Sequence, residues 1–166
     1  TTAEQLRQQA WIEKLRGFDK DIAALRMLWK SIPGEFKFRT KIAAAAAQAY
    51  SKLGDCQSAQ QLLSDSLNEK WDSELVALYG DCQSGDAVAQ IEQAEKWLSL
   101  HKQDAGLLLA LGKLCLHQKL WGKAQSYLDA SLSVTPSHAA YNSLGQLAEL
   151  LGKQDEAFKY YQQAMN

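Results

Sequence analysis

The chain has 166 residues, of which 46% are hydrophobic, and its 18 basic and 19 acidic side chains give a formal net charge of -1. This balance lacks the basic surface that nucleic-acid binding requires, so no nucleic-acid partner is expected. No apolar run reaches the roughly 18 residues that cross a bilayer. The length suits one ordinary core or a stack of about five helical hairpins.

The N-terminal segment is predicted to form two helices. Apolar side chains recur at spacings of three and four through residues 3–16 and 19–32, which is typical of helices packed on one side. Gly17 separates the two helices, and Pro33 with the glycine after it ends the second. Residues 1–34 are therefore predicted to be an N-terminal helix pair.

A first full repeat is predicted over residues 37–68. Gly54 ends its first helix five residues before Ala59, and Gly152 stands at the same distance before Ala157. Because glycine adopts left-handed backbone angles without steric cost, we expect the same left-handed turn in both places. The first helix of this repeat is rich in alanine, which predicts close packing against its neighbours.

The second repeat, residues 72–102, is irregular. Residues 73–83 lack the Leu-Gly pair of the other repeats, and residues 84–86 are predicted to form its turn. The second helix of each repeat nevertheless carries an alanine where it must cross the first helix closely. These alanines are Ala59, Ala94, Ala124 and Ala157.

The last two repeats, residues 104–135 and 137–166, share a motif 33 residues apart, close to the period of about 34 of tetratricopeptide helix pairs. The motif comprises Leu108, Leu111, Gly112, Ala124 and Leu128 in the first copy and Tyr141, Leu144, Gly145, Ala157 and Tyr161 in the second. Pro136 occupies the position of the tetratricopeptide proline. Asp104 and Ser137 are the predicted N-caps of the two first helices.

The repeats predict the fold class. A tetratricopeptide pair cannot bury its own apolar face, so pairs stack on one another and leave a concave surface free for binding. We therefore expect an all-α, tetratricopeptide-like right-handed superhelix of about five antiparallel helix pairs, forming a single domain over residues 1–166. This architecture favours recognition over catalysis.

The side chains that could bind a metal or a cofactor form no motif. Cys56, Cys82 and Cys115 are odd in number and share no CxxC spacing, so neither a disulfide framework nor a zinc site is predicted. A reducing compartment is the simpler hypothesis. The five tryptophans lie at helical spacing among leucines and are predicted to be core residues. Without a phosphate loop or a catalytic constellation, the chain is predicted not to be an enzyme.

Helix register predicts a partner-binding groove, because the first helix of each pair lines the concave surface. In the first repeat the groove positions are Ala44, Gln48, Ser51 and Lys52. The predicted partner-binding set comprises Gln48, Leu109, Lys113, Leu116, His117, Asn142, Gln146 and Glu149. A Lys and Asn clamp for a peptide C-terminus is not expected, because Ala44 and Gln48 occupy its leading positions.

Three segments are more specific than generic repeat positions: residues 94–98 (AEKWL), 107–112 (LLLALG) and 120–124 (LWGKA). Together with residues 71–80 (WDSELVALYG), they resemble the C-terminal region of HemY-type proteins, which are inner-membrane proteins associated with bacterial haem biosynthesis. The resemblance covers most of the chain. It implies a soluble domain joined to N-terminal membrane helices that the chain lacks, and the thiol count favours the cytoplasmic side.

The leading functional hypothesis is a non-catalytic scaffold that holds a protein or peptide segment, with haem-biosynthesis enzymes as the partners that the resemblance implies. The alternative is direct haem or porphyrin binding, with His117 or His101 as axial ligand. No CxxCH haem motif is present, and no metal or cofactor is predicted from the residues themselves. Self-association through the terminal helices is a third hypothesis.

Overall fold

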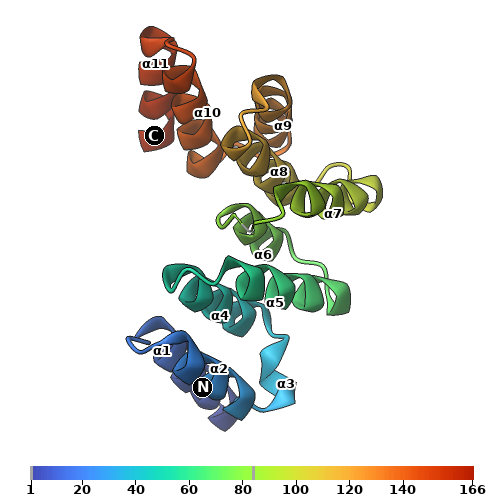
Figure 1. Cartoon of the computed structure of the whole chain (residues 1–166), viewed down its shortest axis with the longest axis vertical. Helices are drawn as coiled ribbons and strands as arrows, with labels where there is room; N and C mark the ends of the chain where they lie inside the picture. Colours follow the sequence, from blue (N-terminus) through green and yellow to red (C-terminus); the bar gives the residue numbers. More distant parts are fainter. Residues whose placement is uncertain (1, 84) are drawn as a thin grey trace. The chain divides into compact units, whose positions relative to one another are not determined.

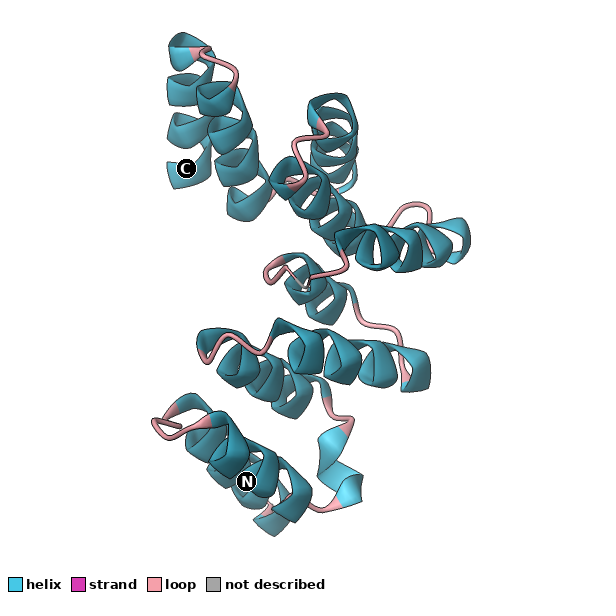
Figure 2. Ribbon diagram, viewed as in Figure 1, coloured by secondary structure: helices cyan, strands magenta, loops and turns pink. Residues whose placement is uncertain are grey.

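The computed structural model describes residues 2–83 and 85–166, which form α-helices joined by short loops (Figures 1 and 2). Helices make up 79% of the chain, and the described residues contain no strand. The predicted all-α class is therefore confirmed. The helices cluster into two compact units, unit 1 (Thr1–Cys82) and unit 2 (Gln83–Asn166), which are described separately.

Unit 1 is organised around the alanine-rich helix α4. Its elements are α1 (Ala3–Arg16), α2 (Ile22–Ser31), α3 (Gly34–Lys37), α4 (Thr40–Lys52), α5 (Cys56–Glu69), α6 (Ser73–Ala77) and the 3₁₀ turn η1 (Leu78–Gly80). Helix α4 contacts α1, α2, α3, α5 and α6. Ala43 and Ala46 are fully buried, and their small side chains let neighbouring helices approach closely. The predicted tight packing of this helix is confirmed.

The boundaries of α2 and α3 differ from the prediction for physical reasons. Helix α2 begins at Ile22 because the carboxylate of Asp21 accepts a hydrogen bond from the Ala24 amide at 2.9 Å. Pro33 ends α2 as predicted, but it also acts as the N-cap of the short helix α3. Its φ of -57° already suits a helical start, so the chain continues into a new helical turn.

The predicted left-handed glycine turns are confirmed. Gly54 has a φ of 81° and Gly152 a φ of 76°, and a Cβ at either position would meet no atom within 4 Å. Glycine is therefore favoured there by backbone angle alone. Lys119 makes the corresponding turn between α8 (Ala105–His117) and α9 (Trp121–Val134) with a φ of 60°, which no glycine in the sequence indicated.

Unit 2 consists of α7 (Ala87–Leu100), α8 (Ala105–His117), α9 (Trp121–Val134), α10 (His138–Leu150) and α11 (Gln154–Met165). Helix α8 packs against α9 and α10 packs against α11, as the repeat predicts. The side chains of Asp104 and Ser137 cap α8 and α10 through the amides of Leu107 and Ala140, at 2.9 and 3.1 Å. Ser84, part of the turn predicted before α7, lies outside the described residues.

Both helix pairs of unit 2 meet at the small side chains that the sequence indicated. Ala124 and Ala157 are buried, as are the equivalent alanines of α5 and α7. A Cβ added to Gly112 would lie 2.5 Å from Cδ2 of Leu128, and one added to Gly145 would overlap the ring of Tyr161. The second helix of each pair therefore fills the space that glycine leaves on the first.

We predict that Gly112→Ala destabilises unit 2 by about 1–3 kcal/mol, because the methyl group overpacks against the buried side chain of Leu128. Gly122→Ala is the matched control, since Gly122 lies in helix α9 with open space around it and alanine favours helix. Urea unfolding measures both variants. Equal stability of Gly112→Ala and the unmodified chain would contradict this packing.

The tryptophans are only partly in the core. Trp97 is buried, but the other four are half-buried, so the prediction is wrong for Trp11, Trp29, Trp71 and Trp121. The ammonium groups of Lys14 and Lys37 lie 4.9 and 5.4 Å from the ring centres of Trp11 and Trp29. Each of these two half-buried rings therefore meets a cation at its face.

The cysteine prediction is wrong for two of the three thiols. Cys56 and Cys82 form a disulfide, with their Cα atoms 5.4 Å apart, and Cys115 is free and buried. The pair lies 26 residues apart in sequence and has no motif, so only the packing of α5 against η1 brings it together. Disulfides persist in oxidising compartments, which removes the basis for the reducing-compartment hypothesis.

Reduction of the disulfide is expected to destabilise unit 1 by about 3.5 kcal/mol, the chain-entropy value for a loop closed across 26 residues. Thermal unfolding with and without a phosphine reductant measures this difference. The double variant Cys56→Ser, Cys82→Ser should unfold at the lower temperature in both conditions. If the reductant left the unfolding midpoint of the unmodified chain unchanged, the disulfide would contribute nothing to stability.

Candidate partner-binding groove

Two adjoining hollows lie along helix α4 in unit 1. The first, about 430 Å³, lies among α1, α4 and α6, and the second, about 370 Å³, lies between α4 and the α6–η1 segment. Gln48 and Leu78 line both hollows. We call the two hollows together the α4 groove. Helices α1 and α4 form its first wall, and α6 with η1 forms its second wall.

The floor of the α4 groove is apolar because small and aliphatic side chains from three helices meet there. Ala45 of α4, Ile12 of α1 and Leu75 of α6 line the first hollow, Ala47 lines the second, and all four are buried. Short alanine side chains leave the hollow open, whereas a larger residue on this face of α4 would fill it. The composition that lets α4 pack closely thus also shapes the groove.

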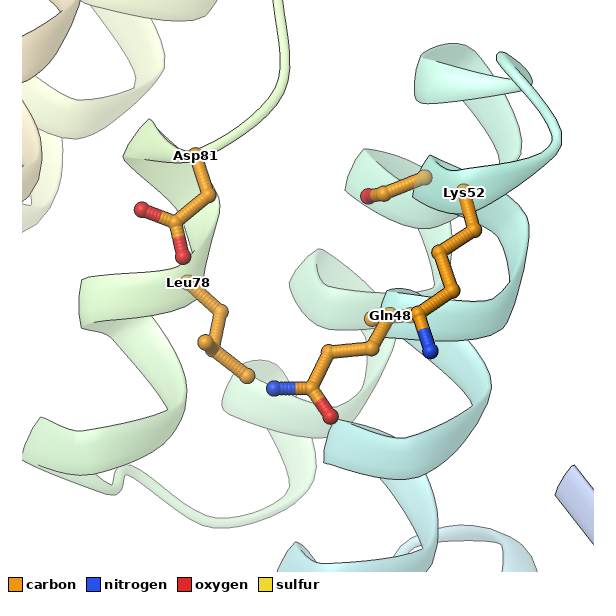
Figure 3. A pocket seen from close by; sticks show the side chains of 6 residues that line it. Gln48, Lys52, Leu78 and Asp81 are labelled. Atoms are coloured by element: carbon orange, nitrogen blue, oxygen red, sulfur yellow. The ribbon is translucent and has the colours of Figure 1, made fainter. Parts of the chain in front are cut away.

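The α4 edge of the groove follows helical spacing. Ala44, Gln48 and Lys52 follow one another at four-residue intervals, Ser51 comes three residues after Gln48, and all four line the groove. These are the groove positions of the first repeat that register predicted. In Figure 3 the side chain of Gln48 extends from α4 toward Leu78, while Lys52 and Asp81 belong to opposite walls.

The second wall is short, and a helix cap, a hydrogen bond and a disulfide hold it in place. Helix α6 has five residues and η1 three, and the Asp72 carboxylate caps α6 through the Leu75 amide at 2.8 Å. From α5, Gln60 Nε2 donates a hydrogen bond to the Cys82 carbonyl at 2.8 Å, beside the Cys56–Cys82 disulfide. One covalent bond and one hydrogen bond therefore fix the end of this wall to α5.

The first wall is held by Arg39, the N-cap residue of α4. Its guanidinium donates hydrogen bonds to Glu4 and to Gln8 of α1, the latter at 3.0 Å, and lies 4.4 Å from the centre of the Phe36 ring. These contacts connect α1 and α3 to the start of α4. The relative position of α1 and α4, on which the width of the first hollow depends, is thereby fixed.

The start of α5 is stabilised by a polar cluster at Asp55. Burial by itself raises the pKa of this carboxyl, but hydrogen bonds from Ser58 and the nearby Arg26 guanidinium outweigh burial and lower the pKa. Arg26 Nη2 lies 3.2 Å from the Asp55 carboxylate and ties α2 to the α5 N-terminus. Since Cys56 is the first residue of α5, this cluster also positions the disulfide.

Charged side chains stand around the rim of the groove. Arg16 of α1 and Lys41 and Lys52 of α4 are cationic, while Glu74 and Asp81 of the second wall are acidic. Within the part of the chain that the structure describes, none of the three cations makes an ion pair or hydrogen bond. The first wall therefore presents positive charge that forms no ion pair with any carboxylate of the described residues.

The predicted groove residues of the later repeats fall into two groups. Leu109 and Leu116 are only 6% and 5% exposed, because α8 packs against α7, α9 and α10 and buries leucines all round. They contribute to the core rather than to an accessible surface. Lys113 is half-buried, and the exposed members are His117, Asn142, Gln146 and Glu149. The Tyr161 hydroxyl hydrogen-bonds to Glu149, and partner binding by this set stays a prediction.

Over residues 2–83 and 85–166, no group of three His, Cys, Asp or Glu side chains is arranged to hold a metal ion. His117 is exposed at the end of α8, and His138 Nδ1 contacts the Ala164 carbonyl. None of the described helices has the length and apolar character needed to cross a bilayer.

Comparison with known proteins shows the fold. No family model and no curated protein matches the chain. Among solved structures, it is similar to PilW, a "widely conserved type IV pilus biogenesis factor", with 24% identity and a TM-score of 0.63 over 99% of this chain and 79% of that one. It is also similar to MamA, with 21% identity and a TM-score of 0.51 over 89% and 95% of the two chains.

The chain has a tetratricopeptide-type helical-repeat fold. A second MamA structure gives the same TM-score of 0.51, with 16% identity, over 95% of this chain and 94% of that one. At these identities the likeness concerns architecture alone. The narrower resemblance to HemY-type proteins stays a prediction from the sequence segments.

Proposed function

We propose that the chain is a non-catalytic scaffold that binds a segment of a partner protein in the α4 groove. The observation that carries this proposal is the row of α4 positions that line the groove along its apolar floor, with Gln48 and Lys52 exposed, in the register expected of a tetratricopeptide binding surface. Stacked helix pairs of this type leave one face free for such contacts. The function is recognition.

The dimensions and chemistry of the groove suit a short extended segment. Helix α4 has 13 residues, so it extends for about 20 Å at 1.5 Å per residue. An extended chain rises about 3.3 Å per residue, so roughly six residues fit alongside α4. The amide of Gln48 offers both a donor and an acceptor to a peptide backbone, and the apolar floor accepts side chains.

Two tyrosine hydroxyls outside the α4 groove have raised pKa values. Burial, as the main cause, raises the pKa of Tyr79 and of Tyr127 to about 12 in each case. Both hydroxyls therefore stay protonated at neutral pH, far from the range in which a general acid or base operates. Neither tyrosine lines the α4 groove.

The disulfide also indicates the kind of cellular compartment in which the domain works. Cys56 and Cys82 hold the second wall of the groove, and their bond is stable where thiols are oxidised. We therefore propose that the domain works in an oxidising compartment, in place of the cytoplasmic side inferred from the thiol count. Mass spectrometry of the chain from its native cells, alkylated before reduction, tests this placement.

The sequence resemblance to HemY-type proteins supports a narrower proposal, in which haem-biosynthesis enzymes supply the bound segment. It also supports haem binding as the second candidate, with His117 as ligand because its side chain is exposed at the end of α8. Haemin titration of the unmodified chain and of His117→Ala separates the two proposals. A saturable absorbance shift that the substitution abolishes would favour haem binding.

Site-specific photo-crosslinking tests the groove directly. We expect benzoylphenylalanine in place of Gln48 to crosslink a defined protein in extract of the native cells, because Gln48 lies at the junction of the two hollows. The same crosslinker at Gln57, an exposed position of α5 that does not line the groove, serves as the control. Equal products from both positions would contradict a groove-specific partner.

A blocking variant separates groove binding from binding elsewhere. Ala44→Trp places a bulky ring in the first hollow and should reduce partner recovery at least tenfold, whereas Gln57→Trp should not. Circular dichroism and melting temperature confirm that both variants fold. The variant Lys113→Glu, Asn142→Ala tests the later repeats, and loss of the partner with this variant alone would move the site to unit 2.

A further inference from the structure

We propose that the α4 groove selects an extended segment in which acidic residues alternate with apolar ones. This inference rests on the proposed scaffold function and adds the chemical class of the partner. Its basis is the unequal charge of the two walls and the apolar floor between them.

The first wall provides the attraction for carboxylates. Lys41 and Lys52 stand eleven positions apart on α4, which corresponds to about 16 Å along the helix axis. Arg16 of α1 faces the same hollow as Lys41. Because none of these cations has an ion-pair partner among the described residues, a bound carboxylate displaces no existing partner. The acidic residues of the segment would therefore face this wall.

The second wall selects against acidic residues on the opposite side of the segment. Leu75 and Leu78 give it an apolar centre, while Glu74 and Asp81 place negative charge near its two ends. Successive side chains of an extended chain point to opposite sides. Apolar side chains at alternate positions would therefore contact the leucines, and carboxylates there would meet repulsion from Glu74 and Asp81.

The spacing of side chains in an extended segment matches the spacing of the cations on the first wall. Side chains on one side of an extended chain are about 6.6 Å apart, so three alternate acidic residues span roughly 13 Å. That length is close to the separation of Lys41 and Lys52 along α4. A six-residue segment would place its carboxylates along the cationic wall and its apolar side chains against Leu75 and Leu78.

A basic segment fits this groove less well. Only Glu74 and Asp81 could attract it, and Asp81 already takes part in an interaction within the chain. The three cations of the first wall would repel it. Charge complementarity therefore favours the acidic segment.

Three fluorescein-labelled hexapeptides with amidated C-termini test the inference: alternating Glu and Leu, alternating Gln and Leu, and alternating Lys and Leu. Fluorescence anisotropy with the oxidised, full chain should give the tightest binding for the Glu–Leu peptide, by about tenfold over the Gln–Leu peptide. Raising the salt concentration should weaken this preference, because exposed charges are screened.

Charge reversal identifies the cations. Lys41→Glu with Lys52→Glu should weaken binding of the Glu–Leu peptide by at least tenfold, since two attractions become repulsions. Lys30→Glu with Lys70→Glu is the matched control, because these exposed lysines lie outside the groove but change the net charge equally. The control should bind the Glu–Leu peptide like the unmodified chain.

Each outcome decides the inference. Preferential binding of the Glu–Leu peptide that Ala44→Trp and the Lys41, Lys52 reversal abolish would support it. Equal or tighter binding of the Gln–Leu or Lys–Leu peptide, still blocked by Ala44→Trp, would overturn the acidic class and leave the scaffold function standing. Failure of all three peptides to bind would overturn the inference, while crosslinking at Gln48 separately decides the scaffold function.

Discussion

Close contact between paired helices at small side chains is the constraint on which this structure depends. In unit 2, Gly112 and Gly145 make room for Leu128 and Tyr161 of the following helix. In unit 1, alanines give α4 contact with five neighbouring helices. The alanine-rich composition that permits this packing also leaves an open hollow on the remaining face of α4, lined by Ala44, Ala45 and Ala47, so the groove is a consequence of how the helices pack.

The groove also depends on interactions that fix the position of each of its two walls. Arg39 joins α1 and α3 to the start of α4, and the Cys56–Cys82 disulfide with the Gln60 hydrogen bond holds the short α6–η1 wall against α5. A wall of so few residues has little internal stability, since most helical stability in proteins comes from tertiary packing. The disulfide compensates for the irregularity of this repeat. It thereby also holds the charged side chains of the second wall, Glu74 and Asp81, in place at the rim of the groove.

Sequence periodicity predicted the fold well because it reports local physics. Turn glycines, N-cap residues and the buried alanines each have a strongly preferred residue type, so Gly54, Asp104 and Ala124 were predictable, whereas the turn at Lys119 was not. The register of α4 likewise placed Gln48 on the groove. Features that depend on distant packing were not predictable: the Cys56–Cys82 pair forms only when α5 meets η1, and Leu109 is buried because α8 has neighbours on several sides. No local pattern distinguishes a leucine facing a groove from one facing another helix.

The central claim is that partner segments lie along α4 in unit 1. Amide hydrogen exchange of the chain, alone and with its crosslink-identified partner, tests it most directly, because bound segments slow exchange where they contact the helices. The account predicts added protection over Thr40–Lys52 and Ser73–Ala77, with unit 2 unchanged. Added protection confined to Ala105–His117 and His138–Leu150 would contradict it and place the binding surface on the later repeats.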